Sequence, residues 1–222
     1  MYNFLDILEI DYVNRLITFG CSYTKGIGLK DEHSAWPWIL AESLQKECVN
    51  LSEAGCSNSK IWWAILNTEF SRSDLVLVHW TYDNRSYTIG KDLDIGPWFN
   101  RVDEPGDLQY TVSKQYYDNL HSVYNSRIDS NLRICDAEDF LSRQGVRNYH
   151  MRVPRRDKDF DYGEDTLFQF KNHLTVNIWD KTKISETIMQ RRGTDGKHPG
   201  EEHHKLFAML IRNELREMGL AG

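Results

Sequence analysis

The sequence predicts an α/β fold with a central parallel sheet and helices on both faces. Short apolar segments alternate along the chain with segments of helical periodicity, and this alternation is typical of strands joined by crossover helices. Asp74–Trp80 is a nearly continuous apolar run, as expected of an interior strand covered on both faces. No internal repeat, low-complexity tract or second-domain boundary interrupts the pattern, so we expect a single domain over residues 1–222.

The first third of the chain shows the strand and helix alternation twice. Arg15–Phe19 predicts a short buried strand that runs into a turn of small residues, and a helix is expected from about 35 to 47. Pro37 is compatible with that helix because it falls in the first turn. Cys48–Leu51 predicts the second strand, and the helix after it is expected to reach about residue 70.

The middle of the chain is less regular. From about 81 to 112 the periodicity disappears, which predicts a loop insertion too long to be a simple connection. Residues 113–144 predict two helical segments, and 146–153 predict a further strand.

The end of the chain predicts a loop followed by a helix. Gly193–Gly200 is rich in turn residues, and 201–218 has the periodicity of an amphipathic helix. Its apolar face is predicted to contain Leu206, Met209 and Leu210.

Composition and charge exclude several classes of function. The formal net charge of −6 argues against a nucleic-acid partner, because phosphate binding draws on clustered Lys and Arg. No run approaches the roughly 18 apolar residues of a membrane span, so no membrane association is expected. The four cysteines form no Cys-x-x-Cys pair and no leader opens the chain, which predicts a soluble protein of a reducing, cytoplasmic compartment.

Three residues have the types and positions that an activated serine requires. A serine hydroxyl becomes a strong nucleophile when a histidine takes its proton, and a carboxylate holds that histidine in the correct tautomer. Ser22 follows a predicted buried strand, which places its hydroxyl at the carboxyl edge of the sheet. Asp195 and His198 share one loop, at a spacing that lets the carboxylate reach one imidazole nitrogen.

The same residues lie in segments that resemble the SGNH (GDSL) hydrolase family. Phe19-Gly-Cys-Ser-Tyr-Thr-Lys-Gly26 resembles the family's first block, Phe-Gly-Asp-Ser-x-Thr-x-Gly, and Asp195-Gly-Lys-His-Pro199 resembles its last block, Asp-x-x-His-Pro. Asn50-Leu-Ser-Glu-Ala-Gly55, followed by Ser57 and Asn58, looks like the middle block. Order and spacing match over residues 16–210.

The resemblance implies a three-layer α/β/α sandwich, the flavodoxin-like SGNH hydrolase fold, and hydrolysis of an acyl ester without a cofactor or metal. It implies Ser22 as nucleophile, His198 as base and Asp195 as the residue that orients it, with backbone amides of Ser22 and Gly55 as oxyanion donors. The implied substrate is a small-molecule or carbohydrate ester.

Two positions depart from the family pattern. Cys21 stands where the family usually has an Asp that supports the loop. Tyr82 falls where the family has an oxyanion-binding Asn, and loss of such a donor typically costs ~10²- to 10³-fold in turnover. Asn58, Asn84 or the Tyr82 hydroxyl are the candidate substitutes. An aromatic-Thr pair with Arg85 nearby resembles divergent SGNH-like proteins of tailed phages, with a host-cytoplasm or virion location.

Other interpretations remain open at this stage. Tyr82 and the long loop favour a binding or virion-associated module that has kept the fold and lost activity. Asp195 with the nearby histidines His198, His203 and His204 suggests a metal-dependent hydrolase, although adjacent helical histidines point in different directions. Cys21 is an alternative nucleophile.

Overall fold

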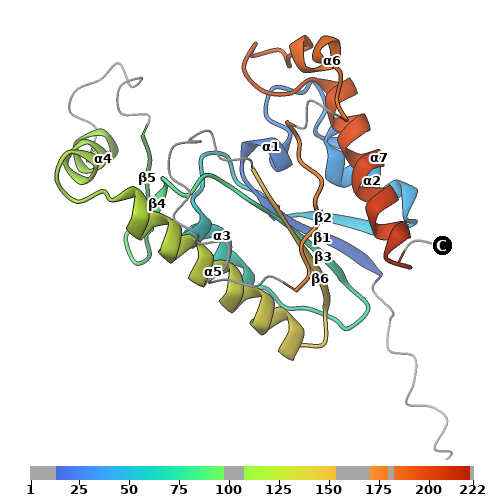
Figure 1. The fold of residues 1–222 in the computed structure, drawn as a ribbon, viewed down its shortest axis with the longest axis horizontal. Helices are drawn as coiled ribbons and strands as arrows, with labels where there is room; N and C mark the ends of the chain where they lie inside the picture. The colour runs from blue at the N-terminus through green and yellow to red at the C-terminus, as the bar shows by residue number, and fades with distance from the viewer. Residues whose placement is uncertain (1–13, 98–107, 154–170, 180–182, 221–222) are drawn as a thin grey trace, which may run out of the picture.

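The computed structural model describes residues 14–97, 108–153, 171–179 and 183–220. Its centre is a parallel sheet of four strands, in the order β2-β1-β3-β6 (Figure 1). The strands are β1 (Arg15–Gly20), β2 (Glu47–Asn50), β3 (Leu75–Trp80) and β6 (Arg147–Arg152). Every residue of β3 is buried, and β3 lies inside the sheet, so the predicted interior strand is confirmed.

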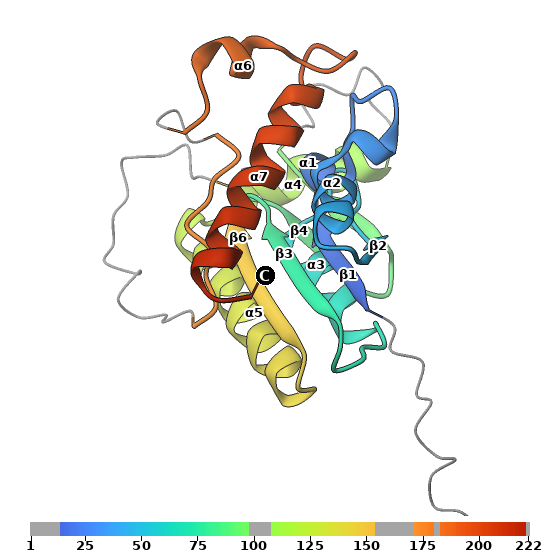
Figure 2. The ribbon, with the colours of Figure 1, turned by 90° about the vertical axis from the view of Figure 1, so that its right-hand side faces the viewer.

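Two pairs of helices cover the two faces of the sheet (Figures 1 and 2). One pair is α2 (Trp36–Ser43) and α7 (Glu201–Glu217), and the other is α3 (Asn58–Leu66) and α5 (Val123–Arg143). Successive residues of β3 pack on opposite faces of the sheet. Leu75 and Leu77 lie in the core on the α2 and α7 side, and Val76 and Val78 lie in the core on the other side. The predicted α/β fold with a central parallel sheet and helices on both faces is therefore confirmed.

Shorter elements complete the described chain. They are α1 (Ser22–Lys25), the 3-10 helix η1 (Glu32–Ser34), β4 (Ser86–Thr88), β5 (Leu93–Ile95), α4 (Leu108–Asn119) and α6 (Glu186–Gln190). The expected helices are present, but α2 and α3 end several residues before the predicted positions. In α2 the reason is Gln45, whose φ of 53° lies in the left-handed region and stops the helix.

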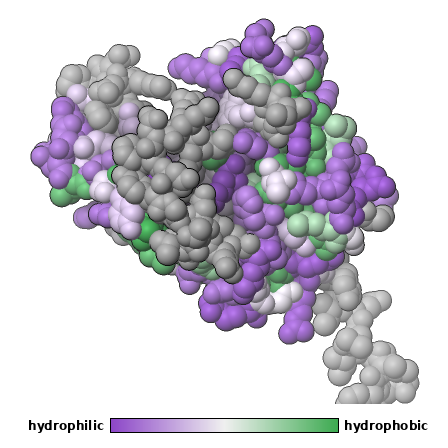
Figure 3. Space-filling model, in the orientation of Figure 1, coloured by the Kyte–Doolittle hydropathy of each residue, from purple (hydrophilic) through white to green (hydrophobic). Residues whose placement is uncertain are grey.

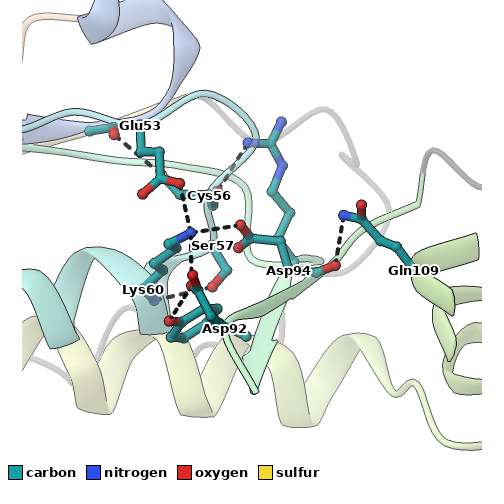
Figure 4. A network of polar contacts seen from close by, with 10 residues as sticks. Glu53, Cys56, Ser57, Lys60, Asp92, Asp94 and Gln109 are labelled. Atoms are coloured by element: carbon teal, nitrogen blue, oxygen red, sulfur yellow. Dashed lines mark hydrogen bonds and ion pairs between the residues drawn. The ribbon is translucent and has the colours of Figure 1, made fainter. Parts of the chain in front are cut away.

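The predicted loop at 81–112 is partly wrong. It contains the antiparallel hairpin β4–β5, and α4 begins within it at Leu108; residues 98–107 lie outside the described chain. Three-residue strands are too short to produce a periodic pattern in the sequence. Ion pairs with a distant helix hold this hairpin in place. Figure 4 shows Lys60 of α3 between Glu53, Asp92 and Asp94, with nitrogen to oxygen distances of 2.7, 3.5 and 3.1 Å.

The predicted apolar face of the last helix is partly wrong: of its three residues, Leu210 packs against the core from a partly buried position. Met209 is 49% exposed, and Leu206 and Leu210 are only partly buried. The face that packs against the sheet carries two histidines with four apolar residues: His203, His204, Phe207, Ala208, Ile211 and Leu215. A face chosen from apolar residues alone misses buried imidazoles that bond within the fold.

Among the coloured residues of the face seen in Figure 3, hydrophobic side chains lie in groups between hydrophilic ones. Within the described residues, no helix has the length and apolar character that crossing a bilayer requires.

An ion pair at the amino end of the sheet joins β1 to the start of β3. Arg15 donates from Nε and Nη2 to the two carboxylate oxygens of Asp74, at 3.0 and 2.7 Å. The Asp74 carboxylate also accepts from the Ser71 N–H at 2.7 Å, and its side chain is fully buried. A buried carboxylate with three such bonds stabilises the fold mainly because removing any partner leaves the others unsatisfied.

We expect Asp74→Asn to lower the free energy of unfolding by about 2 kcal/mol, since the neutral amide cannot replace charge-assisted bonds to Arg15. Urea unfolding measures this loss. The control is Asp139→Asn, an exposed residue of α5 for which the change should be within about 0.5 kcal/mol. Equal stability of the two variants would contradict a structural role for the pair.

Candidate active site

Ser22 lies at the carboxyl end of β1, where the chain turns directly into α1. Its side chain is largely buried, with the residue 9% exposed. Gly20 is required before this turn, because a Cβ there would overlap the Thr24 side chain. Thr24 is fixed by a 3.1 Å hydrogen bond to Nδ1 of the buried His79, whose pKa burial lowers to about 4. The neutral imidazole therefore supports the first turn after Ser22.

The loop after β2 packs against the same turn. The Glu53 N–H and the Cys56 thiol both donate to the Gly20 carbonyl, at 3.0 and 3.2 Å. Gly55 adopts a φ of 80°, which favours glycine. Among the described residues, none accepts a hydrogen bond from the backbone N–H of Ser22 or Gly55. Both amides are thus available to a ligand.

Two hydrogen bonds join His198 to Asp195 in the loop before α7, and Lys197 adds a third to the same carboxylate. The His198 Nδ1–H donates to Asp195 Oδ2 at 2.5 Å, and the N–H groups of His198 and Lys197 donate to Oδ1 at 3.0 and 2.9 Å. The backbone and side-chain bonds from His198 hold the pKa of Asp195 well below its usual range. Asp195 is therefore an ionised acceptor, and it fixes His198 in the tautomer with the proton on Nδ1.

Gly28 connects this loop to the chain that follows Ser22. Thr194 donates to the Gly28 carbonyl from its N–H at 2.7 Å and from its hydroxyl at 3.0 Å. A Cβ on Gly28 would lie 2.8 Å from Asp195 Oδ1, so the approach leaves no room for a side chain. Gly28 also has a φ of 89°, and both requirements select glycine at this position.

The two segments also meet through their side chains. The ring of Tyr23, the residue after Ser22, packs edge-on against the His198 imidazole with centroids 5.7 Å apart. The Ser22 hydroxyl and His198 Nε2 are not hydrogen-bonded to each other, and Nε2 has no partner among the described residues. The structure thus places the sequence-predicted Ser22, Asp195 and His198 at one edge of the sheet, with the imidazole nitrogen that a base would use left open.

Tyr82 and Arg85 approach the site from the carboxyl end of β3. The Tyr82 hydroxyl lies 3.4 Å from that of Tyr23, and the Arg85 guanidinium lies over the Tyr82 ring at 5.3 Å. Arg85 also donates to the Cys56 carbonyl and the Thr81 hydroxyl, at 3.1 and 3.0 Å. These contacts tie the position of Tyr82 to the loop that carries Gly55.

The two asparagines that sequence reasoning offered as oxyanion donors have other contacts. Asn58 is 2% exposed, accepts from the Thr81 N–H at 2.8 Å and donates to the Thr81 carbonyl and the Ser130 hydroxyl, both at 3.2 Å. Asn84 is exposed, and its carbonyl accepts from the Tyr117 hydroxyl. Asn58 therefore positions Thr81, the residue before Tyr82.

Sequence reasoning missed part of the surroundings of His198. Trp179 packs edge-on against Tyr23 with ring centroids 5.6 Å apart, and the Arg192 guanidinium lies over Trp179 at 5.1 Å. Tyr23 carried a signal, because it adjoins the predicted nucleophile. Trp179 carried none, since it follows a charged, irregular stretch of sequence and reaches the site only through the tertiary fold.

The alternative residues occupy different environments. Cys21 is fully buried in the core with Ile17 and Phe19, and a thiol in that position cannot reach a substrate. His203 Nε2 bonds to the Ile178 carbonyl at 2.5 Å, whereas His204 Nδ1 accepts from the Trp36 N–H at 3.1 Å. The two adjacent histidines thus bond in separate directions. Among the described residues there is no group of three metal-ligating side chains.

Solved structures with the same fold are hydrolases or proteins described as such. A putative lipolytic protein of the G-D-S-L family from Desulfitobacterium hafniense is 12% identical, with a TM-score of 0.56 over 91% of this chain and 99% of that one. The esterase EstA from Pseudoalteromonas is 13% identical, with a TM-score of 0.53 over 92% and 98%. The acetyl xylan esterase Est2A from Butyrivibrio proteoclasticus is 12% identical, with a TM-score of 0.56 over 94% and 65%.

The sequence itself matches no family model, and no curated protein matches it. At 12 to 13% identity, these structural similarities establish the fold, which is the one seen in SGNH hydrolases.

We expect Gly28→Ala to destabilise the protein more than Gly90→Ala. Both glycines have positive φ, of 89° and 78°, so each substitution introduces backbone strain of about 1 kcal/mol. A Cβ at Gly90 meets nothing within 4 Å, whereas the one at Gly28 meets Asp195. Because of this clash, Gly28→Ala should lower the free energy of unfolding, measured in urea, by about 2 kcal/mol more than Gly90→Ala does.

An NMR spectrum of the imidazole protons adds a local measurement. The Nδ1 proton of His198 should shift or disappear in Gly28→Ala and stay in place in Gly90→Ala. Equal effects of the two substitutions on unfolding and on this proton would show that Gly28 does not position Asp195.

Proposed function

We propose that this chain is an ester hydrolase of the SGNH family in which Ser22, His198 and Asp195 form a catalytic triad. The observation that carries the proposal is the ionised Asp195 held 2.5 Å from Nδ1 of His198, on a loop that contacts the chain after Ser22. An oriented imidazole beside a serine at the carboxyl edge of a parallel sheet is the arrangement that acyl transfer needs.

In the proposed reaction His198 Nε2 takes the proton of the Ser22 hydroxyl as the oxygen attacks the ester carbonyl. Asp195 stabilises the imidazolium that forms, and His198 then gives the proton to the departing alcohol. Water repeats the sequence on the acyl-enzyme: His198 removes a proton from the water, the carboxylic acid leaves, and Ser22 recovers its hydrogen. No cofactor is needed for these steps.

The oxyanion would be bound by three donors. The free backbone amides of Ser22 and Gly55 supply two, and the Tyr82 hydroxyl supplies the third in place of the family's asparagine. Two of the candidate substitutes are less suitable, because the Asn58 amide is held by Thr81 and Ser130 and Asn84 is exposed. Arg85 acts through Tyr82 by holding its ring.

A small-molecule or carbohydrate ester is the substrate class we propose. Ser22 is only slightly exposed, so a compact acyl group fits better than a large one. Tyr23 packs beside His198 and itself contacts Trp179 and Tyr82. Aromatic rings with polar edges suit a partner that is apolar on one side and hydroxylated on the other. The acetyl xylan esterase among the structural neighbours is consistent with this class.

A second candidate is a binding module that has kept the fold and lost activity. The Tyr82 departure favours it, because an inadequate third donor would leave a slow enzyme. The two functions differ in whether Ser22 is activated.

We expect a fluorophosphonate to add to Ser22. The serine oxygen displaces fluoride from phosphorus, which requires its proton to be removed by His198. Intact-mass spectrometry should show one adduct on the wild type and none on Ser22→Ala or His198→Ala. Ser34→Ala is the control and should be labelled like the wild type. A folded wild type that takes no adduct would favour the binding module.

We expect Tyr82→Phe to lower kcat for a phenyl or naphthyl acetate by ~10²-fold with little change in KM, since an oxyanion donor acts mainly in the transition state. Steady-state kinetics measure both constants. Tyr87→Phe is the matched control, because Tyr87 lies on the β4–β5 hairpin and bonds to Asp92 at 2.8 Å. Unchanged kcat in Tyr82→Phe would exclude the hydroxyl as a donor.

A further inference from the structure

A pocket lies at the amino ends of the strands, on the opposite side of the sheet from the proposed active site. It has a volume of about 300 Å³ and lies among the amino ends of β3 and β6, the end of α2 and the last turns of α7. Ligand-binding pockets for small molecules begin at about this size. Because Ser22 follows the carboxyl end of β1, the two sites are separated by the length of the strands.

The charged groups of this pocket are all cationic. Lys46, Arg147, Arg212 and Arg216 line it, and no carboxylate of the described residues does. Arg212 and Arg216 are four residues apart on α7, where like charges lie on the same face and repel. The three arginines are exposed, so water screens most of this repulsion, and a bound anion would offset the remainder.

Two acidic residues that adjoin pocket residues in the sequence have other partners. Asp74 is bound by Arg15, and Glu214 accepts from the backbone N–H groups of Thr175 and Val176. Burial, and then the charge of Arg147, lower the pKa of Lys46 despite an opposing effect of Asp74. None of the four cations forms an ion pair with another described residue.

A role in stabilising helix ends explains only one of these residues. Arg216 lies in the last turn of α7, where a cation favours the carbonyl end of the helix dipole. Arg147 begins a strand, and the Lys46 ammonium donates to the Asn14 side chain. Helix electrostatics do not account for the presence of these two in the same pocket.

Part of the wall is apolar, beside the polar residues Ser43 and Gln45. Leucines contribute it from three parts of the chain: Leu44, Leu75, Leu215 and Leu220. Guanidinium groups match the oxygens of a phosphate in paired hydrogen bonds, and several of them suit a dianion better than a monoanion. A phosphate group alone would fill only a fraction of the volume, which leaves space for an organic part against the leucines.

We propose that this pocket binds a small phosphate monoester, with the phosphoryl group held by Arg147, Arg212 and Arg216 and the organic part against the leucines. The site is independent of the proposed hydrolase activity. The Gln45 side chain, at the end of α2, also lines the pocket and adds an uncharged polar contact.

Isothermal titration with three probes tests the chemistry: inorganic phosphate, glycerol 3-phosphate and glycerol. We expect saturable binding of both phosphates, at least as tight for glycerol 3-phosphate, and none of glycerol. Absence of saturable binding of glycerol 3-phosphate would overturn the proposal, and so would binding of inorganic phosphate alone.

Substitutions of the pocket arginines test where glycerol 3-phosphate binds. Arg212→Gln with Arg216→Gln should weaken glycerol 3-phosphate binding at least tenfold, while Lys205→Gln, on an exposed position of the same helix, should leave it unchanged. Circular dichroism verifies that each variant is folded, and Arg147→Gln provides a second test from a different element. Equal weakening by Lys205→Gln, or unchanged binding in both pocket variants, would refute the site.

His198→Ala separates this site from the proposed active site. It should abolish fluorophosphonate labelling and leave glycerol 3-phosphate binding intact. Loss of phosphate binding in His198→Ala would place the phosphate at the catalytic edge and overturn the proposal, whereas failed labelling of the wild type with intact phosphate binding would count only against the hydrolase.

Discussion

The close contact between Gly28 and the loop before α7 is the constraint on which the proposed active site depends. Asp195 and His198 lie more than 160 residues after Ser22 in the sequence, and this contact joins the two segments. Neither partner tolerates a side chain, because a Cβ on Gly28 would meet Asp195 and one on Gly193 would overlap the Gly28 carbonyl. The imidazole is therefore held by backbone packing as well as by its hydrogen bonds to Asp195.

The sheet supplies the rigid support for this contact. Parallel strands place Ser22, the Gly55 loop and Tyr82 at the same edge, since each follows the carboxyl end of its strand. The buried neutral His79, through Thr24, and Asn58, through Thr81, hold the first residues beyond two of those strands. Buried polar side chains beside the site thus position the backbone that carries the candidate site residues.

The edges of the sheet differ in charge and chemistry. An ionised Asp195 and aromatic rings lie at the carboxyl edge, whereas cations and leucines gather at the amino edge. The β4–β5 hairpin is fastened between α3 and α4, because Lys60 binds its carboxylates and Gln109 donates to the Asp94 carbonyl at 3.0 Å (Figure 4). This network fixes the segment that follows Tyr82 and Arg85.

Sequence alone was sufficient for the strands of the parallel sheet, the interior position of β3 and the crossover helices, because hydrophobic periodicity and strand ends are local properties. The roles predicted for Ser22, Asp195 and His198 stay predictions. Sequence alone was insufficient for the β4–β5 hairpin, the histidine-bearing face of α7 and the place of Trp179 beside Tyr23. Those features depend on contacts between distant segments, such as Lys60 with Asp94 or His204 with the Trp36 amide, and such contacts exist only once the sheet has brought the segments together.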